Sequence, residues 1–175
     1  MRKESIHSAN VDVEIDKLTN SIELVATGDV FNTIVMRADP TDKRLINRKE
    51  WQFDWHAEIL KEKREVYRLM TENNPAIIQG LVSFEDKGDH IYMHLIESAA
   101  FNRGRGKTFL GVPGNLIAYG CKLAFNNGYD GFLAFTAKTA LVQHYRDSLG
   151  AIVIRGTLMH LDSTAARILV QRYKL

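Results

Sequence analysis

Residues 91–125 read IYMHLIESAAFNRGRGKTFLGVPGNLIAYGCKLAF, and the order of patterns in this stretch decides the fold. Ile91–Ala99 reads as a strand, and Phe101–Leu110 is a loop rich in glycine and basic residues. Pro113–Phe125 then predicts a helix, because proline suits its first turn and Gly128 suits its end. The apolar face of that helix comprises Leu116, Ile117, Cys121, Ala124 and Phe125.

The glycine-rich loop is a candidate phosphate site. A loop of this kind leaves several backbone N–H groups pointing one way, and the positive end of the helix dipole adds to them. The basic residues just upstream are Arg103, Arg105 and Lys107. A Walker A loop is absent, because Gly106-Lys107-Thr108 lacks the required earlier glycine, and Phe101 stands there instead. A glycine-rich turn with solvated cations remains the alternative interpretation.

The elements on either side predict a mixed sheet. Upstream, the strands Val66–Thr71 and Ile77–Phe84 are joined to Ile91–Ala99 by tight turns, which predicts an antiparallel meander. Downstream lie a strand at Phe132–Phe135, a helix at Ala140–Leu149, one or two strands within Ile152–Leu161 and a helix at Ala165–Tyr173, which Asp162-Ser163-Thr164 could cap. Strands joined through a helix run parallel. We therefore predict an α+β fold of the α/β/α type, with a mostly antiparallel central sheet and helices on both faces.

The first third of the chain carries weaker signals. We expect residues 1–10 to be a loose tail and Val11–Ile15 and Val30–Arg37 to be strands. Lys17–Ala26 fits a helix or a strand, and Asn47–Lys63 predicts one short helix with loops. No linker divides the 175 residues, so we predict a single domain.

Composition excludes several classes of protein. Lys and Arg number 23 against 21 Asp and Glu, which is no basic footprint for nucleic acid. No window approaches 18 consecutive apolar residues, and the first 12 residues have no apolar core, so we expect neither a membrane span nor a signal peptide. The single cysteine, Cys121, excludes an internal disulfide and fits a cytoplasmic location. The histidines share no ligand spacing with cysteine or acid pairs, so we predict no metal site.

The order of strand, glycine-rich loop, helix, strand and tyrosine-bearing helix resembles the GNAT superfamily of N-acetyltransferases over residues 65–160. The resemblance implies a core that binds acetyl-CoA as co-substrate, with Tyr145 as general acid. The pantetheine arm would lie along Leu95, Ile96 and Glu97, and the phosphates along Lys107, Gly111, Val112, Gly114, Asn115 and Leu116. Lys138 is nearest to the position of an asparagine that the family carries. The implied partners are acetyl-CoA and an amine, and a homodimer is compatible.

The residue types fit acyl transfer to a primary amine by direct attack in a ternary complex. An attacking amine must lose a proton, and Glu97 and His94 are the candidate bases. They point to opposite faces of the strand unless a bulge intervenes, as it often does in this superfamily. A catalytically inactive module that binds or senses CoA is the alternative function, as is a protein-interaction domain on the same fold. The acceptor stays open.

Overall fold

The computed structural model describes residues 10–16, 18 and 21–173, so the tail predicted over residues 1–10 lies almost wholly outside it. The strands are β1 (Ile22–Leu24), β2 (Val30–Phe31), β3 (Thr33–Ala38), β4 (Glu65–Thr71), β5 (Gly80–Asp86), β6 (Ile91–Ser98), β7 (Phe109–Leu110), β8 (Leu133–Thr136), β9 (Ile152–Arg155) and β10 (Leu158–Leu161). The helices are α1 (Trp55–Ile59), α2 (Val112–Asn126), α3 (Val142–Leu149) and α4 (Ser163–Arg172), with 3-10 helices η1 (Pro40–Leu45), η2 (Ala100–Asn102) and η3 (Thr139–Leu141).

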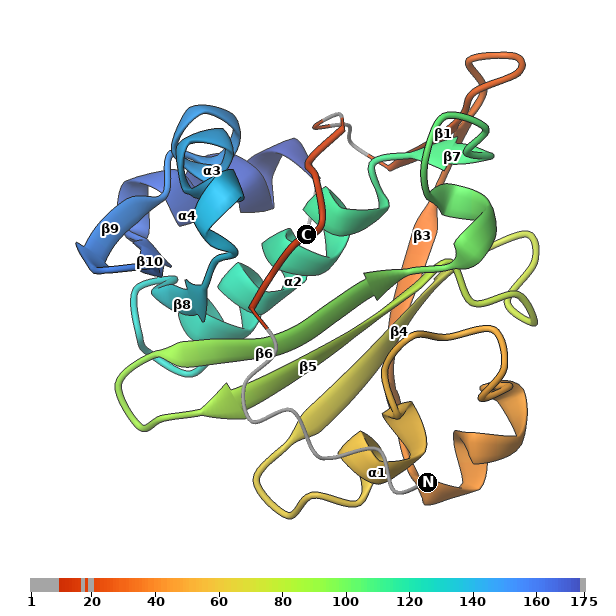
Figure 1. Ribbon diagram of the computed structural model, residues 1–175, viewed down its shortest axis with the longest axis horizontal. Coiled ribbons are helices and arrows are strands. Elements are labelled where there is room, and N and C mark those ends of the chain that lie inside the picture. The colour runs from red at the N-terminus through yellow and green to blue at the C-terminus, as the bar shows by residue number, and fades with distance from the viewer. Residues whose placement is uncertain (1–9, 17, 19–20, 174–175) are drawn as a thin grey trace.

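The central sheet is mixed, as predicted. Its strand order is β3-β4-β5-β6-β8-β10-β9, and all neighbours are antiparallel except β6 and β8 (Figure 1). These two strands pair in parallel only where Ile91–Met93 faces Leu133–Phe135. A second sheet of order β2-β1-β7 lies near the N-terminus of α2.

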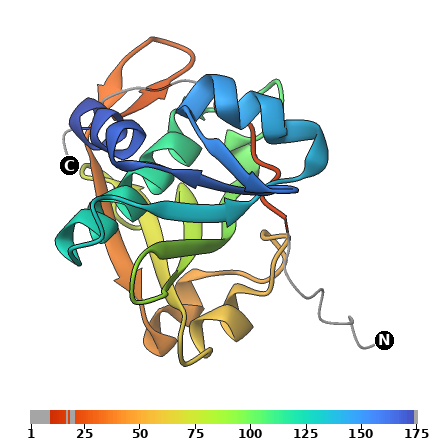
Figure 2. The same cartoon turned by 90° about the vertical axis from the view of Figure 1, so that its left-hand side faces the viewer.

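Helices cover both faces of the central sheet, which confirms the predicted layers. α2, α3 and α4 lie on one face, and α1 with η1 lies on the other (Figures 1 and 2). Successive residues of a strand point to opposite faces, so Val66 packs in the smaller core with Trp55 while Tyr67 packs in the larger one. The larger core contains the buried side chains of α2, α3 and α4.

Helix boundaries follow the local sequence. Gly111 adopts a left-handed conformation (φ 92°) immediately before α2, which places proline in the first turn. Asn127 is the C-cap of α2, and the left-handed Gly128 follows it, as its position predicted. The Asp162 carboxylate accepts from the Ala165 N–H at 2.9 Å and caps α4.

Three predictions of strands need correction. Val11–Ile15 is no strand, because only Val11 forms a bridge and the residues beyond it bond to side chains. The strand predicted from Ile77 begins at Gly80, because the Ile77 N–H turns back to the Asn74 carbonyl. The strand predicted over Val30–Arg37 is interrupted at Asn32, between β2 and β3.

Candidate functional site

β6 and β8 separate along their length, and the region where they part, which residues of the chain itself fill, is here called the cleft. Beyond Met93 and Phe135 the two strands no longer pair, and Val11 pairs instead with Ala137 just after β8. Val11 is the first residue of the segment 11–16, here called the strap. The Val11 N–H donates to the Thr136 carbonyl at 2.7 Å, and the Lys138 N–H donates to the Val11 carbonyl at 2.8 Å. In Figure 1 the strap runs from beside β6 toward the N-terminus of α2. The cleft therefore holds an extended piece of the chain itself.

The strap has an inner and an outer side. Val11 and Ile15 are 3% and 8% exposed and belong to the larger core, whereas Asp12 and Glu14 face solvent. This is the alternation of an extended chain with one buried face. Burying each aliphatic side chain contributes about 1.5–3 kcal/mol relative to leaving it exposed. The strap is thus held by apolar contacts as well as by hydrogen bonds.

Helix α3 supplies two side chains to the cleft. The Tyr145 side chain is fully buried against Phe135, and its hydroxyl donates to the Val13 carbonyl. Burial, followed by the charges of the nearby strap carboxylates, raises the pKa of the Tyr145 hydroxyl, which stays protonated at neutral pH. The neighbouring His144 accepts from the Ile15 N–H at 2.8 Å through Nε2.

The N-terminus of α2 holds a carboxylate where the sequence predicts phosphate. Asp16 accepts from the Gly111 N–H at 3.1 Å and from the Lys107 ammonium at 3.0 Å. A helix N-terminus and a nearby cation together favour an anion, and here the anion is a side chain of the strap. The predicted phosphate residues Lys107 and Gly111 thus lie together.

The other predicted residues of this loop face inward. Val112 and Leu116 are core side chains, and the Asn115 side-chain amide donates to the Gly111 carbonyl at 2.8 Å. A Cβ at Gly114 would clash with the Tyr173 hydroxyl, so this glycine allows the chain after α4 to approach α2. Only the first turn of α2 can offer a ligand its backbone N–H groups, since these side chains are committed to the fold and the Asn115 N–H already donates to the Gly111 carbonyl.

The predicted arm-binding residues on β6 are divided between the two sides of the sheet. Ile96 is buried in the larger core, while the half-buried Leu95 packs against the smaller one. Lys138 is exposed at the start of η3 and contributes its backbone N–H to the strap. These positions flank the separation of β6 and β8.

Glu97 is 2% exposed, and its carboxylate is saturated with donors. It accepts from the Gln52 N–H at 2.6 Å, from the Phe53 N–H at 3.3 Å and from the Trp55 indole at 2.8 Å. Arg103 adds a charge at 3.8 Å. The sequence singled out Glu97 as an acid inside an apolar strand, and these donors explain how the fold accommodates it.

His94 lies at an irregularity of β6. The pairing of β5 with β6 shifts by one residue at this point, so His94 has no direct partner across the ladder. Its ring bonds Glu85 at 2.7 Å, and burial lowers the pKa of His94 despite that carboxylate. The charges of Arg64 and Glu58, both on the α1 side, also act on His94. The shift therefore brings His94 to the side on which Glu97 meets Trp55.

Sequence reasoning missed Asp16, His144 and Glu58 as members of these clusters. Glu58 is buried and accepts from the Ser83 hydroxyl at 2.6 Å, with Lys61 and Arg64 as ionic partners. Asp16 and His144 meet partners that are remote in sequence, and so does Glu58 where it bonds Ser83, and no spacing rule reports such a contact. The alternation of Val11, Val13 and Ile15 was the one available signal for the strap.

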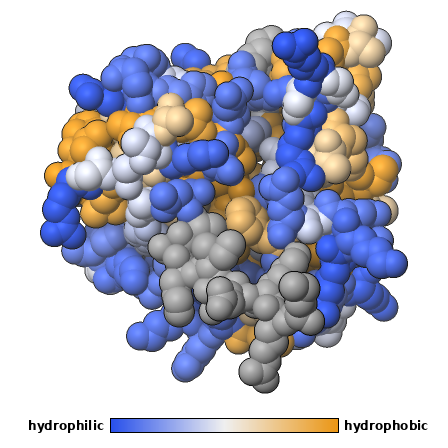
Figure 3. Space-filling view, in the orientation of Figure 1, coloured by the Kyte–Doolittle hydropathy of each residue, from blue (hydrophilic) through white to orange (hydrophobic). Residues whose placement is uncertain are grey.

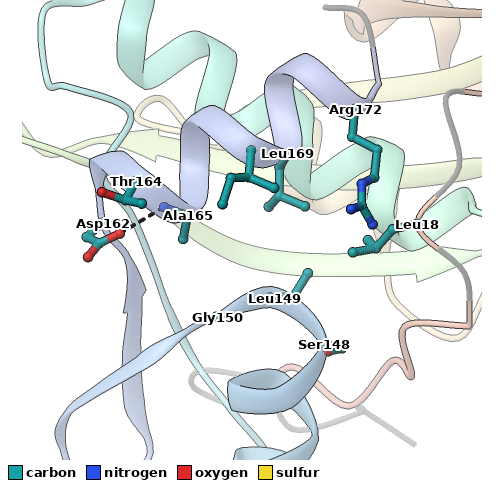
Figure 4. A pocket seen from close by; sticks show the side chains of 10 residues that line it. Leu18, Ser148, Leu149, Gly150, Asp162, Thr164, Ala165, Leu169 and Arg172 are labelled. Atoms are coloured by element: carbon teal, nitrogen blue, oxygen red, sulfur yellow. Dashed lines mark hydrogen bonds between the residues drawn. The ribbon is translucent and has the colours of Figure 1, made fainter.

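A pocket of about 420 Å³ lies between α3 and α4 (Figure 4). Leu18, Leu149 and Leu169 give it an apolar wall, and Arg172 reaches toward Leu18. On the face drawn in Figure 3 the surface is mostly hydrophilic, and hydrophobic residues gather over β9 and near β1. Among the described residues no helix is long and apolar enough to cross a membrane.

Comparison with known proteins identifies the fold. No protein-family model and no curated protein matches the chain. Among solved structures, a mutant form of the spermidine/spermine N-acetyltransferase SpeG from Vibrio cholerae is similar with a TM-score of 0.51 and 12% identity, over 78% of this chain and 97% of that chain. The acetyltransferase AAC(6')-Iy, solved with a CoA bisubstrate analogue, has a TM-score of 0.46 and 15% identity over 71% and 98%. The chain has the GNAT-like fold that its motif order predicted.

Proposed function

We propose that the protein transfers an acetyl group from acetyl-CoA to a primary amine by direct attack in a ternary complex. One observation carries the proposal: the cleft between β6 and β8 offers backbone groups, a protonated tyrosine and a helix N-terminus along a single extended occupant. An acyl-CoA is such an occupant, with an amide-bearing arm and a pyrophosphate. The fold shared with SpeG, whose name gives a polyamine acetyltransferase, supports the same chemistry.

The groups of the cleft fit each step of the reaction. The amine nitrogen attacks the thioester carbonyl and forms the C–N bond, and backbone N–H groups near Ile96 stabilise the oxyanion. Collapse of the intermediate breaks the C–S bond, and the Tyr145 hydroxyl gives its proton to the departing thiolate. Tyr145 carries its proton at neutral pH, as a general acid must, and burial makes it a weaker donor than an exposed tyrosine by raising its pKa.

The base is proposed on the α1 side of β6. Glu97 stands beside the arm-binding positions, but its oxygens already accept three hydrogen bonds, so it would accept the amine proton through water. His94 is the second candidate, because its lowered pKa leaves the ring neutral and able to accept a proton. A turnover profile against pH separates them, since loss of activity on acidification just below the ordinary histidine pKa of 6.5 indicates the imidazole.

Calorimetry with acetyl-CoA, followed by a thiol-release assay over polyamines, lysine peptides and aminoglycosides, tests the proposal. Binding together with amine-dependent release of CoA thiol is the expected result. Binding without thiol release for any amine would instead support an inactive CoA-binding module. Absence of any binding heat or melting shift would contradict both the enzyme and the inactive CoA-binding module. It would instead support a protein-interaction domain on the same fold.

A further inference from the structure

The strap is bound in the manner of a ligand. The backbone after β8 contacts Val11, the Tyr145 hydroxyl contacts Val13, and the N-terminus of α2 contacts Asp16. In the proposed reaction the Tyr145 hydroxyl protonates the thiolate of acetyl-CoA, and the N-terminus of α2 binds its pyrophosphate. The strap and the co-substrate therefore require two of the same groups, the Tyr145 hydroxyl and the Gly111 N–H.

We propose that the strap is an autoinhibitory segment that competes with acetyl-CoA for the cleft, a role that rests on the proposed function. In the closed state Tyr145 donates to a peptide carbonyl, so its proton is directed away from a thiolate. Acetyl-CoA binds only the fraction of molecules in which the strap is released, and its apparent dissociation constant rises by the inverse of that fraction.

Charge makes the competition specific. The Asp16 carboxylate accepts from Lys107 and from the Gly111 N–H, which are a cation and a helix-terminal donor suited to phosphate. The anion of the strap thus stands where the anion of the co-substrate would bind. Lys107 gains a phosphate partner only when it gives up Asp16.

The strap makes few hydrogen bonds to the backbone of the central sheet. Among the described residues its one ladder contact is the bridge at Val11, and its other hydrogen bonds to the cleft go to side chains and to one loop amide. Asp12 and Glu14 project into solvent on its outer side. Its opening therefore costs mainly the burial of Val11 and Ile15 and few ladder hydrogen bonds. Release therefore leaves the ladders of the central sheet intact.

Calorimetry on the 175-residue chain with acetyl-CoA tests the competition. Asp16→Asn keeps the side-chain shape but removes the competing charge, and we expect it to bind about tenfold more tightly than the wild type. Asp12→Asn removes an equal charge from the exposed side of the strap, and we expect its affinity to stay within about twofold. Equal affinities of the wild type and Asp16→Asn would overturn the inference.

Hydrogen exchange on the unmodified chain gives a second readout. Saturating acetyl-CoA is expected to accelerate exchange of the Val11 and Ile15 amides by about tenfold or more, because their acceptors lie in the cleft. Binding with both amides still protected would overturn the inference and leave the proposed function standing. If neither the wild type nor Asp16→Asn binds acetyl-CoA, the proposed function itself fails, and the competition fails with it.

Discussion

The two sides of β6 satisfy their buried polar groups in different ways. On the α1 side, the Glu97 carboxylate accepts hydrogen bonds from the loop before α1 and from Trp55, the first residue of that helix, and this segment packs in the smaller core. On the α2 side, the Tyr145 hydroxyl donates a hydrogen bond to the carbonyl of Val13, which lies 132 residues away in sequence. The first arrangement fixes a carboxylate within the fold. The second places an exchangeable piece of chain against groups that a ligand could use.

Removing the Glu97 carboxylate tests whether the α1 side is fixed within the fold, and it has the largest expected effect. Glu97→Ala leaves the Gln52 and Phe53 amides and the Trp55 indole without their acceptor, so we expect a loss of about 3–5 kcal/mol in the free energy of unfolding. Urea denaturation at neutral pH measures it. Glu62→Ala removes an exposed carboxylate and should change stability by less than about 0.5 kcal/mol. A loss below about 1 kcal/mol for Glu97→Ala would show that this side is not held as described.

Removing the Tyr145 hydroxyl tests the cleft side. Tyr145→Phe should lower turnover about 100-fold, because the thiolate loses its acid, while stability falls by only about 1 kcal/mol. Tyr129→Phe is the matched control, since that hydroxyl bonds Asp86 in a separate exposed cluster. Steady-state kinetics on both variants measures the effect. Unchanged turnover in Tyr145→Phe would show that Tyr145 is not the general acid.

Gly114→Ala tests how closely the chain after α4 packs on the first turn of α2. The new Cβ would meet the Tyr173 hydroxyl, and we expect a loss of about 1–3 kcal/mol on thermal or chemical unfolding. Gly106→Ala, at a position with open space, should stay close to the wild type. Stabilisation of Gly114→Ala by about 1 kcal/mol, the gain of alanine over glycine within a helix, would show that Tyr173 moves aside freely.

The smallest expected effect is a dependence on alkaline pH. Burial raises the pKa of Tyr145 above the ordinary tyrosine value of 10.0, so the unfolded chain ionises first. The stability from this shift is complete below pH 10.0 and is lost as pH rises through the folded-state value. Between about pH 8 and 11, the stability difference between the wild type and Tyr145→Phe should shrink by about 1 kcal/mol. If the stability difference between the two proteins stayed constant over this pH range, the Tyr145 hydroxyl would not be shielded from water.

The sequence predicted the fold better than it predicted the contacts of the site. The glycine-rich loop, the first-turn proline and the cap at Asp162 are local signals, and the structure confirms the helices that they predict. The strand-forming residues and the turns between them also located β4 and β6 to within a residue. Topology then followed from the rule that strands joined through a helix run parallel, which β6 and β8 obey.

The contacts that the sequence could not predict join residues far apart in the chain. Alternation at Val11–Ile15 predicted an extended segment, but its partners lie on β8 and α3. Likewise, Glu97 was recognised as unusual within its strand, but its three donors come from residues 52–55. A carboxylate with no donors and one with three give the same sequence pattern, so only the structure distinguishes them.

The distance along the chain between the strap and its partners has a consequence for biosynthesis. The strap is made first, but its contacts on α3 lie 129 and 132 residues later. At roughly 5–20 residues per second, the ribosome takes about 6–26 s to cover that interval. During this time the apolar side of Val11 and Ile15 has no place to dock. The strap therefore stays undocked until α3 has been made.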